Sequence, residues 1–143
     1  MARPALVLDA SVGVKWYSDK GESFIAQSLA IRDAHIHKML LVIVPDLFYF
    51  EVANAVVQKK FIPVSDVQQA VKDLFDLGLY TESIKSKLLV NAVDLSRRFN
   101  TTTYDAIYAV IAALNNCPLV TANPRHQKQD LGCQVIPIDQ WKM

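Results

Sequence analysis

The stretch ALVLDASV (residues 5–12) decides how the rest of the chain is read. Its four apolar residues, Ala5 to Leu8, predict a short buried strand. The acid Asp9 follows directly, and the small hydroxyl residue Ser11 stands two positions on. Asp9 is either part of an Asx-type turn or a charge that the strand delivers to a functional site at its carboxyl end.

Short apolar runs alternate with segments of helical periodicity along the chain. We expect strands at 5–8, 39–44, 80–84, 119–121 and 135–138, and helices at 22–37, 46–60, 63–78, 85–99 and 102–116. Apolar strands separated by helices predict a parallel sheet that is covered on both faces. The expected fold class is α/β: a single domain over residues 1–143, built as a three-layer α/β/α sandwich with a mostly parallel sheet of about five strands.

Composition narrows the class of protein. The chain has 143 residues, 52% of them hydrophobic, which is enough for one core. Its net charge of +1 argues against nucleic-acid binding through bulk electrostatics, so such a partner needs a local patch or metal ions. No apolar run of about 18 residues and no secretory signal is present, so we expect a cytoplasmic protein with no membrane partner.

The two cysteines stand at matching places before the last two predicted strands. Cys117 precedes Leu119 by two residues and Cys133 precedes Val135 by two. If those strands are parallel neighbours, the two Cα atoms lie about 5 Å apart, within disulfide range. Reduced thiols are the expected state in a cytosolic protein, and a disulfide is the alternative. The absence of a CxxC or Cys/His cluster argues against a zinc site.

Glu51 stands in a helix that is otherwise made for burial. The predicted helix 46–60 is apolar on almost every side, which predicts that most of it is buried. Asn54 and Gln58 share roughly the face of Glu51. Alternatively, therefore, the acid heads a thin stripe that faces solvent, as most acids do.

Polar residues also begin the last long helix and end the strand after it. Asp105 is the only charged residue from Tyr104 to Leu114, although an acid in a first turn also suits the helix dipole. Thr121 and Asn123 follow the strand 119–121, where Asn-Pro is also an ordinary turn signal.

Taken together, these acids indicate a site for a cation. Converging carboxylates raise one another's pKa unless a cation lies among them. A ligand set of oxygen atoms alone selects a hard ion, Mg²⁺ or Mn²⁺. Such ions activate water and neutralise phosphate charge, so the pattern points to phosphoryl chemistry.

Four blocks of sequence, in this order, resemble the PIN-domain family and, within it, the VapC-type toxins of toxin–antitoxin pairs. They are LVLDASV (6–12), PDLFYFEVANAV (45–56), TTTYDAIYAVIAALNNCPLVTANPRH (101–126) and VIPID (135–139), and they cover essentially the whole chain. The resemblance implies a metal-dependent endoribonuclease with a parallel α/β/α sheet. It also implies an RNA substrate, a cognate antitoxin and a homodimer.

The resemblance also assigns the site residue by residue. Asp9, Glu51 and Asp105 match the three characteristic acids, which would hold Mg²⁺ or Mn²⁺. Asn123 matches a fourth, more variable catalytic position, and Ser11 and Thr121 match small hydroxyl residues that line the site. Many relatives carry Asp where Asn123 stands. With three carboxylates, one divalent ion is well compensated and a second is not, so we expect the second ion to bind weakly or only with substrate.

Basic and aromatic residues beside these blocks are weaker candidates for substrate contacts. Lys15 follows Asp9, and Arg125, His126 and Lys128 follow Asn123; ordinary solvated surface charge is the alternative for all four. Trp16 and Tyr17 have the rings to stack on bases, but packing within the protein is the favoured role.

Three other classes of protein are alternatives to the nuclease. An acid-nucleophile phosphatase needs a second Asp where Ser11 stands, and a receiver domain needs paired acids at the first strand tip. Neither pattern is present. A non-catalytic PIN-like module that binds RNA or protein remains the alternative; the intact acid triad favours the nuclease.

Overall fold

Five parallel strands form one sheet in the order β3-β2-β1-β4-β5 in the structure, a computed structural model that describes residues 3–123 and 131–143. The strands are β1 (Ala5–Leu8), β2 (Leu41–Pro45), β3 (Tyr80–Glu82), β4 (Leu119–Thr121) and β5 (Val135–Pro137). In register, Val7 pairs with Ile43 on one side and with Leu119 on the other. The expected fold class and strand number are therefore confirmed.

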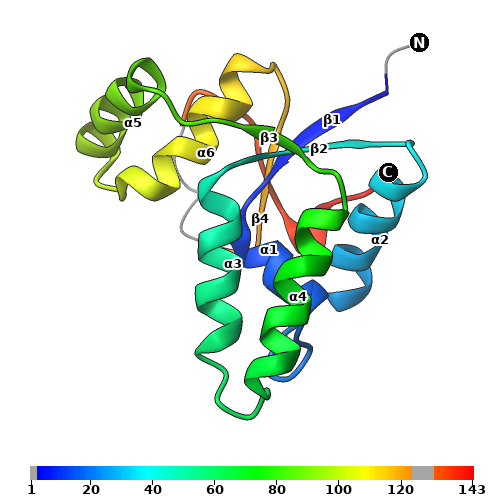
Figure 1. Cartoon of the computed structure of the whole chain (residues 1–143). Helices are drawn as coiled ribbons and strands as arrows, with labels where there is room; N and C mark the ends of the chain where they lie inside the picture. Colours follow the sequence, from blue (N-terminus) through cyan, green and yellow to red (C-terminus); the bar gives the residue numbers. More distant parts are fainter. Residues whose placement is uncertain (1–2, 124–130) are drawn as a thin grey trace.

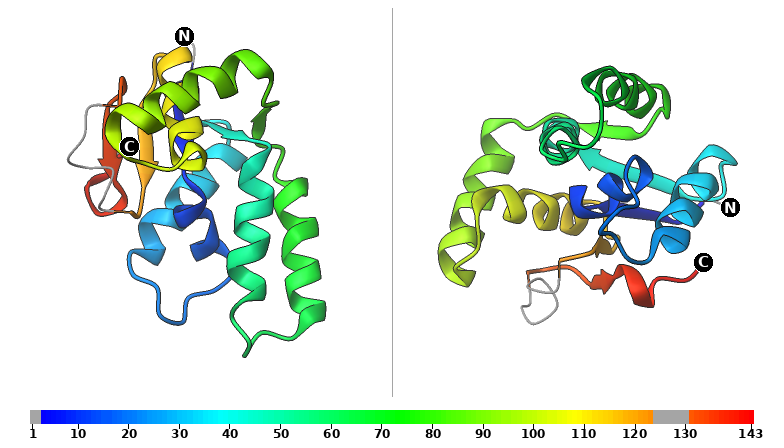
Figure 2. Two further views of the ribbon diagram at one scale, coloured as in Figure 1. Left: turned by 90° about the vertical axis from the view of Figure 1, so that its left-hand side faces the viewer. Right: turned by 90° about the horizontal axis from the view of Figure 1, so that it is seen from below.

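Helices cover both faces of this sheet, as Figures 1 and 2 show. They are α1 (Ala10–Gly13), α2 (Ile25–Ile36), α3 (Leu47–Val57), α4 (Val64–Asp76), α5 (Ser86–Phe99) and α6 (Thr103–Leu114), with short 3₁₀ turns η1 (Val14–Trp16) and η3 (Ile138–Gln140). The strands lie between α6, which carries α5 on its outer side, and α2. Helices α3 and α4 lie side by side and extend away from the sheet.

Several helix ends differ from the expected ones. Helix α3 ends at Val57, so Lys59 and Lys60 follow the helix instead of forming its last turn. Helix α2 begins three residues later than expected, because Phe24 takes a left-handed backbone conformation (φ 56°) in which a helix cannot continue. The spacing of the apolar residues Phe24, Ile25, Leu29, Ile31 and Ile36 in the sequence predicts one buried stripe, yet Phe24 and Ile36 are exposed.

The buried face of α2 is partly polar. Its fully or nearly buried residues are Ser28, Ile31, Ala34 and His35. The Oγ of Ser28 donates to the carbonyl oxygen of Val12, and the indole Nε1 of Trp16 donates to the carbonyl oxygen of Ser28. Because these polar groups are paired, they can be buried at little cost. Hydropathy periodicity therefore identified the buried Ile31 but missed the polar residues Ser28 and His35 on the same face.

The order of the strands places β1 at a topological switch point. The chain leaves β1 toward β2 on one side and returns to β4 on the other. The backbone N–H of Asp9 donates to the carbonyl oxygen of Val120 (3.0 Å), which joins the carboxyl ends of β1 and β4. Ligands bind at such points in open α/β sheets.

Helix α1 packs tightly against α3 at Gly13. A Cβ atom on Gly13 would lie 2.6 Å from Cζ of the fully buried Phe48 and 3.2 Å from a methyl group of Val52. Glycine is therefore required at this contact. The contact sets the distance between the segment that follows Asp9 and the helix that carries Glu51.

Two smaller predictions have outcomes in the fold. Cys117 and Cys133 precede parallel neighbours, as expected, and both are thiols in the structure. No helix within residues 3–123 and 131–143 has the length and apolar character needed to cross a membrane.

Candidate active site

Asp9 lies where β1 gives way to α1 and is held by two hydroxyl groups. Its side chain is buried, with 6% of the residue exposed. Its Oδ2 accepts hydrogen bonds from Ser11 Oγ (2.5 Å) and Thr121 Oγ1 (2.9 Å). Each hydroxyl donates its one proton to the acid, so both stabilise its charged form and fix its orientation. Ser11 and Thr121, which the resemblance assigns to the lining of the site, therefore both contact this acid.

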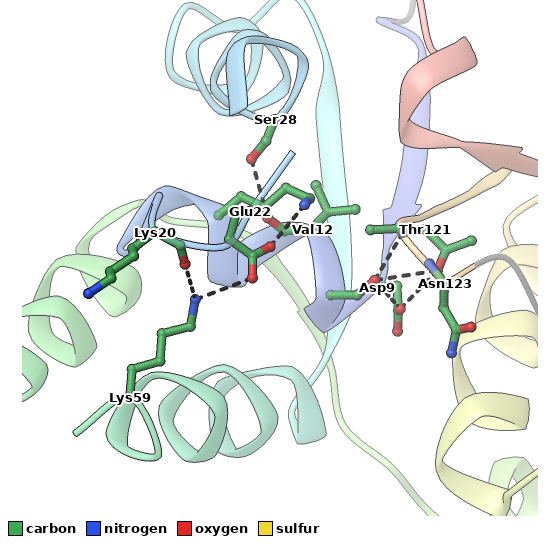
Figure 3. Close-up of polar contacts among 11 residues, drawn as sticks. Asp9, Val12, Lys20, Glu22, Ser28, Lys59, Thr121 and Asn123 are labelled. Atoms are coloured by element: carbon green, nitrogen blue, oxygen red, sulfur yellow. Dashed lines mark hydrogen bonds and ion pairs between the residues drawn. The ribbon is translucent and has the colours of Figure 1, made fainter. Parts of the chain in front are cut away.

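The same two hydroxyls also hold the chain after β4. Ser11 Oγ accepts from the backbone N–H of Ala122 (3.0 Å), and Thr121 Oγ1 accepts from that of Asn123 (2.9 Å). Figure 3 shows Asp9, Thr121 and Asn123 meeting at this point. Residues more than 110 positions apart in sequence thus form one hydrogen-bonded group at the carboxyl edge of the sheet.

Glu51 is half-buried near the middle of α3. Burial raises the pKa of its carboxyl, and the charges of Asp9 and Asp105 raise it further. A hydrogen bond from the Tyr108 hydroxyl to Glu51 Oε1 (2.6 Å) acts in the opposite direction. Charge repulsion falls with distance. The effect of Asp9 and Asp105 on the pKa of Glu51 therefore indicates that the three carboxyl groups lie near one another.

Asp105 occupies the first turn of α6, where Thr102 is the N-cap. The backbone N–H of Asp105 donates to Thr102 Oγ1 (3.0 Å). The threonines at 101–103 predict a capped helix start, which Thr102 confirms, and an acid in this turn suits the helix dipole. Asp105 thus suits the start of the helix, and its charge also raises the pKa of Glu51.

Tyr108 is a residue of the site that sequence reasoning did not identify. It is fully buried in α6, one turn after Asp105. Burial and the neighbouring charges of Glu51 and Asp9 raise the pKa of its hydroxyl well above the ordinary value, so it serves as a hydrogen-bond donor. The available signal was that Tyr108 is the only hydroxyl residue between Ala106 and Leu114 and stands at i+3 from a candidate acid.

Other candidates have different outcomes. Lys15 is not solvated surface charge: it is buried, and its Nζ lies 2.9 Å from Oε1 of Glu22. Trp16 is buried in the core, which agrees with the favoured packing role. Arg125, His126 and Lys128 lie outside the described residues.

Helix α3 is less buried than its composition predicts. Phe48 and Tyr49 pack in the core, whereas Phe50 is 73% exposed and Val57 is also exposed. The helix extends away from the sheet, so one of its sides has no layer above it (Figure 1).

The donor set suits a hard divalent cation, although it is not a preassembled site. In the described part of the chain, no three His, Cys, Asp or Glu side chains are arranged to bind one ion together. The chemistry nevertheless fits. The described hydrogen bonds of Asp9 and Glu51 use only Oδ2 and Oε1, which leaves one oxygen of each carboxylate for an ion. A cation would also relieve the repulsion that raises the pKa of Glu51.

The family model of the PIN domain matches residues 6–131, which include every element that positions these acids. The chain belongs to the PIN domain family. No curated protein gives a significant match.

Solved structures that resemble this PIN domain agree in fold. VapBC2 from Rickettsia felis, bound to a DNA fragment from its promoter, matches with a TM-score of 0.68 and 17% identity, over 96% of this chain and 99% of that chain. PAE2754 from Pyrobaculum aerophilum has a TM-score of 0.65 and 20% identity, over 97% and 92%. A toxin–antitoxin complex from Klebsiella pneumoniae has a TM-score of 0.64 and 17% identity, over 96% and 99%.

Proposed function

We propose that this PIN domain is a metal-dependent endoribonuclease that cleaves single-stranded or structured RNA. One observation carries the proposal: hydroxyl groups hold acids from distant elements, since Ser11 and Thr121 donate to Asp9 and Tyr108, one turn after Asp105 on α6, donates to Glu51 on α3. Repulsion among the three carboxylates, which adds to the raised pKa of Glu51, weakens the fold unless a cation or a substrate offsets it. Active sites are where such arrangements concentrate.

Each residue of the candidate active site has a stated role in this proposal. Asp9, Glu51 and Asp105 would hold a divalent ion, Mg²⁺ or Mn²⁺, through carboxylate oxygens, with Asn123 beside them. When bound, the ion supplies positive charge at the phosphate and acidifies a water molecule. Ser11 and Thr121 fix Oδ2 of Asp9, and Tyr108 fixes Oε1 of Glu51. Such supporting contacts keep ligand oxygens in place before the substrate arrives.

The proposal extends to the partners of the chain. Two of the structural neighbours are VapBC2 and a toxin–antitoxin complex, and each matches nearly the full length of this chain. On that basis we propose that the protein is the toxin of a toxin–antitoxin pair. A cognate antitoxin, a homodimer and a cytoplasmic location belong to the same proposal. Light scattering of the purified chain, alone and with the product of a neighbouring gene, tests the two assembly states.

The alternative is a PIN-like module that binds RNA or protein without cutting it. Its support is that the acids are not arranged as a finished metal site in the described residues. The presence of all three acids, with hydroxyl groups that orient two of them, favours catalysis.

The deciding experiment is cleavage of labelled RNA. Wild-type protein is incubated with Mg²⁺, Mn²⁺ or excess chelator, beside the variants Asp9→Asn and Asp105→Asn. Asp94→Asn is the matched control, because Asp94 is exposed on α5 and, among the described residues, forms an ion pair with Arg98 at the surface. We expect metal-dependent cleavage in the wild type and the control, with a loss of at least about a hundredfold in both site variants.

Cleavage that survives in Asp9→Asn or in excess chelator would contradict the metal-dependent mechanism. Metal binding and RNA binding without cleavage of any tested RNA would instead support the non-catalytic module.

A further inference from the structure

A cavity of about 370 Å³ lies beside the acid group on the side of β5. Lys15, Glu22, Phe24, Thr121 and Asp139 line it, together with neighbouring residues of the same segments. Its volume falls in the range of small-molecule sites, roughly 300–1,000 Å³. Thr121 belongs both to this cavity and to the hydrogen bonds of Asp9, so the cavity adjoins the candidate active site directly.

Lys15 brings unused hydrogen-bonding capacity to this cavity. Its side chain is only 6% exposed. Among the described residues its ammonium group makes one hydrogen bond, to Glu22 Oε1 (2.9 Å). An ammonium group carries three donors, and a buried donor without a partner is costly. The cavity therefore favours an occupant that supplies acceptor oxygen or nitrogen atoms.

The charge of the cavity indicates what kind of occupant fits. Glu22 neutralises Lys15, and Lys59 Nζ also contacts Glu22 at 3.2 Å, as Figure 3 shows. Asp139, on η3, adds an exposed carboxylate acceptor on the opposite segment. The lining thus offers donors and acceptors together without an excess of positive charge. Such a lining suits a neutral polar group better than a phosphate.

Phe24 adds an aromatic surface. Its ring is 46% exposed although it lines the cavity, and its backbone is in the left-handed region (φ 56°). A bulky residue in this region is uncommon, and such residues concentrate at functional sites. An exposed ring beside mixed donors and acceptors is the surface on which bases of single-stranded nucleic acids stack.

We propose that this cavity binds the base and ribose of the nucleotide next to the scissile phosphate. The base packs on Phe24, Lys15 donates to a base or ribose acceptor, and Asp139 accepts from a base amino group. This inference rests on the proposed ribonuclease function and gives that site a means of choosing its cleavage position. A protein segment is the other occupant with mixed polarity, and the experiment below separates the two.

The test measures affinity for a panel of short single-stranded RNAs covering the four bases, in Ca²⁺ so that binding is read without turnover. The variants are Phe24→Ala and Asp139→Asn. Tyr80→Ala and Asp94→Asn are the controls, since Tyr80 is an exposed ring on β3, at the opposite edge of the sheet from β5, and Asp94 is an exposed acid on α5. We expect Phe24→Ala to lose roughly tenfold in affinity and the controls to stay within about twofold. Asp139→Asn should reduce the preference for bases with an amino group over uracil.

An abasic scan separates contact from a structural effect. A single abasic nucleotide is moved along the tightest-binding RNA, and each RNA is measured with wild type and Phe24→Ala. We expect one position at which the abasic change weakens the wild type but has no added effect in Phe24→Ala, because the two changes remove the same contact. Additive effects at every position would overturn the proposal, as would wild-type affinity in both cavity variants.

The remaining outcomes also decide between the two proposals. A wild type that binds RNA but cuts none in Mg²⁺ or Mn²⁺ would defeat the ribonuclease, while the scan still judges the cavity. A wild type that binds no RNA of the panel would overturn the cavity proposal and favour a protein occupant.

Discussion

At the scale of single residues, the candidate site depends on hydroxyl groups as much as on acids. Asp9 is buried, and Ser11 and Thr121 both donate hydrogen bonds to its Oδ2. Without these two hydroxyls, its carboxylate would lack the hydrogen bonds that the structure gives it. Buried charges are tolerated when they are paired or hydrogen-bonded. The small polar residues around the acids are therefore part of the site.

Removal of one of these hydroxyls should be visible in both stability and metal binding. Thr121→Val deletes the donor to Asp9 and the acceptor for the Asn123 N–H. We expect the free energy of unfolding to fall by about 1–3 kcal/mol and the affinity for Mn²⁺ to fall roughly 10–100-fold. Chemical denaturation and calorimetry measure the two effects. Thr121→Ser keeps the hydroxyl and should restore both; equal loss in Thr121→Ser would contradict the role given to the oxygen.

Asn123 should limit the number of tightly held ions. Two divalent ions bring four positive charges to three carboxylates, so the second is poorly compensated. Calorimetric titration with Mn²⁺ should give one tight site in the wild type. Asn123→Asp adds a fourth carboxylate and should tighten the second site by about tenfold or more. Two tight sites in the wild type, without RNA, would disprove this expectation.

At the scale of elements, the site is assembled by the packing of α1 on α3. Gly13 on α1 lies so close to Phe48 on α3 that no Cβ fits between them. This contact joins the segment that follows Asp9 to the helix that carries Glu51.

Gly13→Ala should therefore act as an overpacking mutation. The new methyl group meets the ring of Phe48, which is fully buried and cannot move aside freely. We expect a loss of about 1–3 kcal/mol in the free energy of unfolding, measured by urea denaturation. Phe48→Leu shortens the opposing side chain, so the double variant should lose less than the sum of the single losses. Full additivity would show that the two positions do not compete for space.

At the scale of the whole molecule, one ionic group joins the segment from Lys15 to Glu22 to the chain just after α3. Glu22 bonds with Lys15 on η1 and with Lys59 after α3, and Lys59 also donates to the carbonyl oxygen of Lys20 (3.4 Å). Burial alone would raise the pKa of Glu22, but hydrogen bonds from Lys15 and Lys59 and their charges hold it below its ordinary value of 4.5. The basic end expected for α3 thus serves a tertiary contact.

This ionic group should make stability depend on pH in a defined direction. A carboxyl with a lowered pKa in the folded protein stabilises it at pH values above the unfolded pKa, and the contribution is lost as pH falls through the folded pKa. At pH 7 we expect Glu22→Gln to lower the free energy of unfolding by about 1–3 kcal/mol. The gap to wild type should narrow as pH falls below about 4.5. A constant gap from pH 7 to pH 3 in urea denaturation would contradict the assignment, and Asp94→Asn serves as the exposed control.

The sequence by itself determined the fold class, the alternation of strands and helices and the identity of the candidate acids. These features depend on local patterns: apolar runs form buried strands, threonine caps a helix, and acids in apolar surroundings stand out. The cap of Asp105 by Thr102 and the strands 5–8 and 119–121 agree with these local expectations.

Only the tertiary structure decided what each polar group contacts. Partners such as Tyr108 and Glu51, or Thr121 and Asp9, are 57 and 112 residues apart, and no local pattern encodes such pairs. The buried stripe of α2 and the exposed Phe50 on α3 also depended on which neighbours cover each helix. Hydrophobicity fixes how much of a chain is buried, whereas the order of the strands fixes which side chains meet. For that reason the sequence pointed to the acids and to Ser11 and Thr121, whereas only the fold showed which carboxylate oxygen these hydroxyls hold and that Tyr108 holds Glu51.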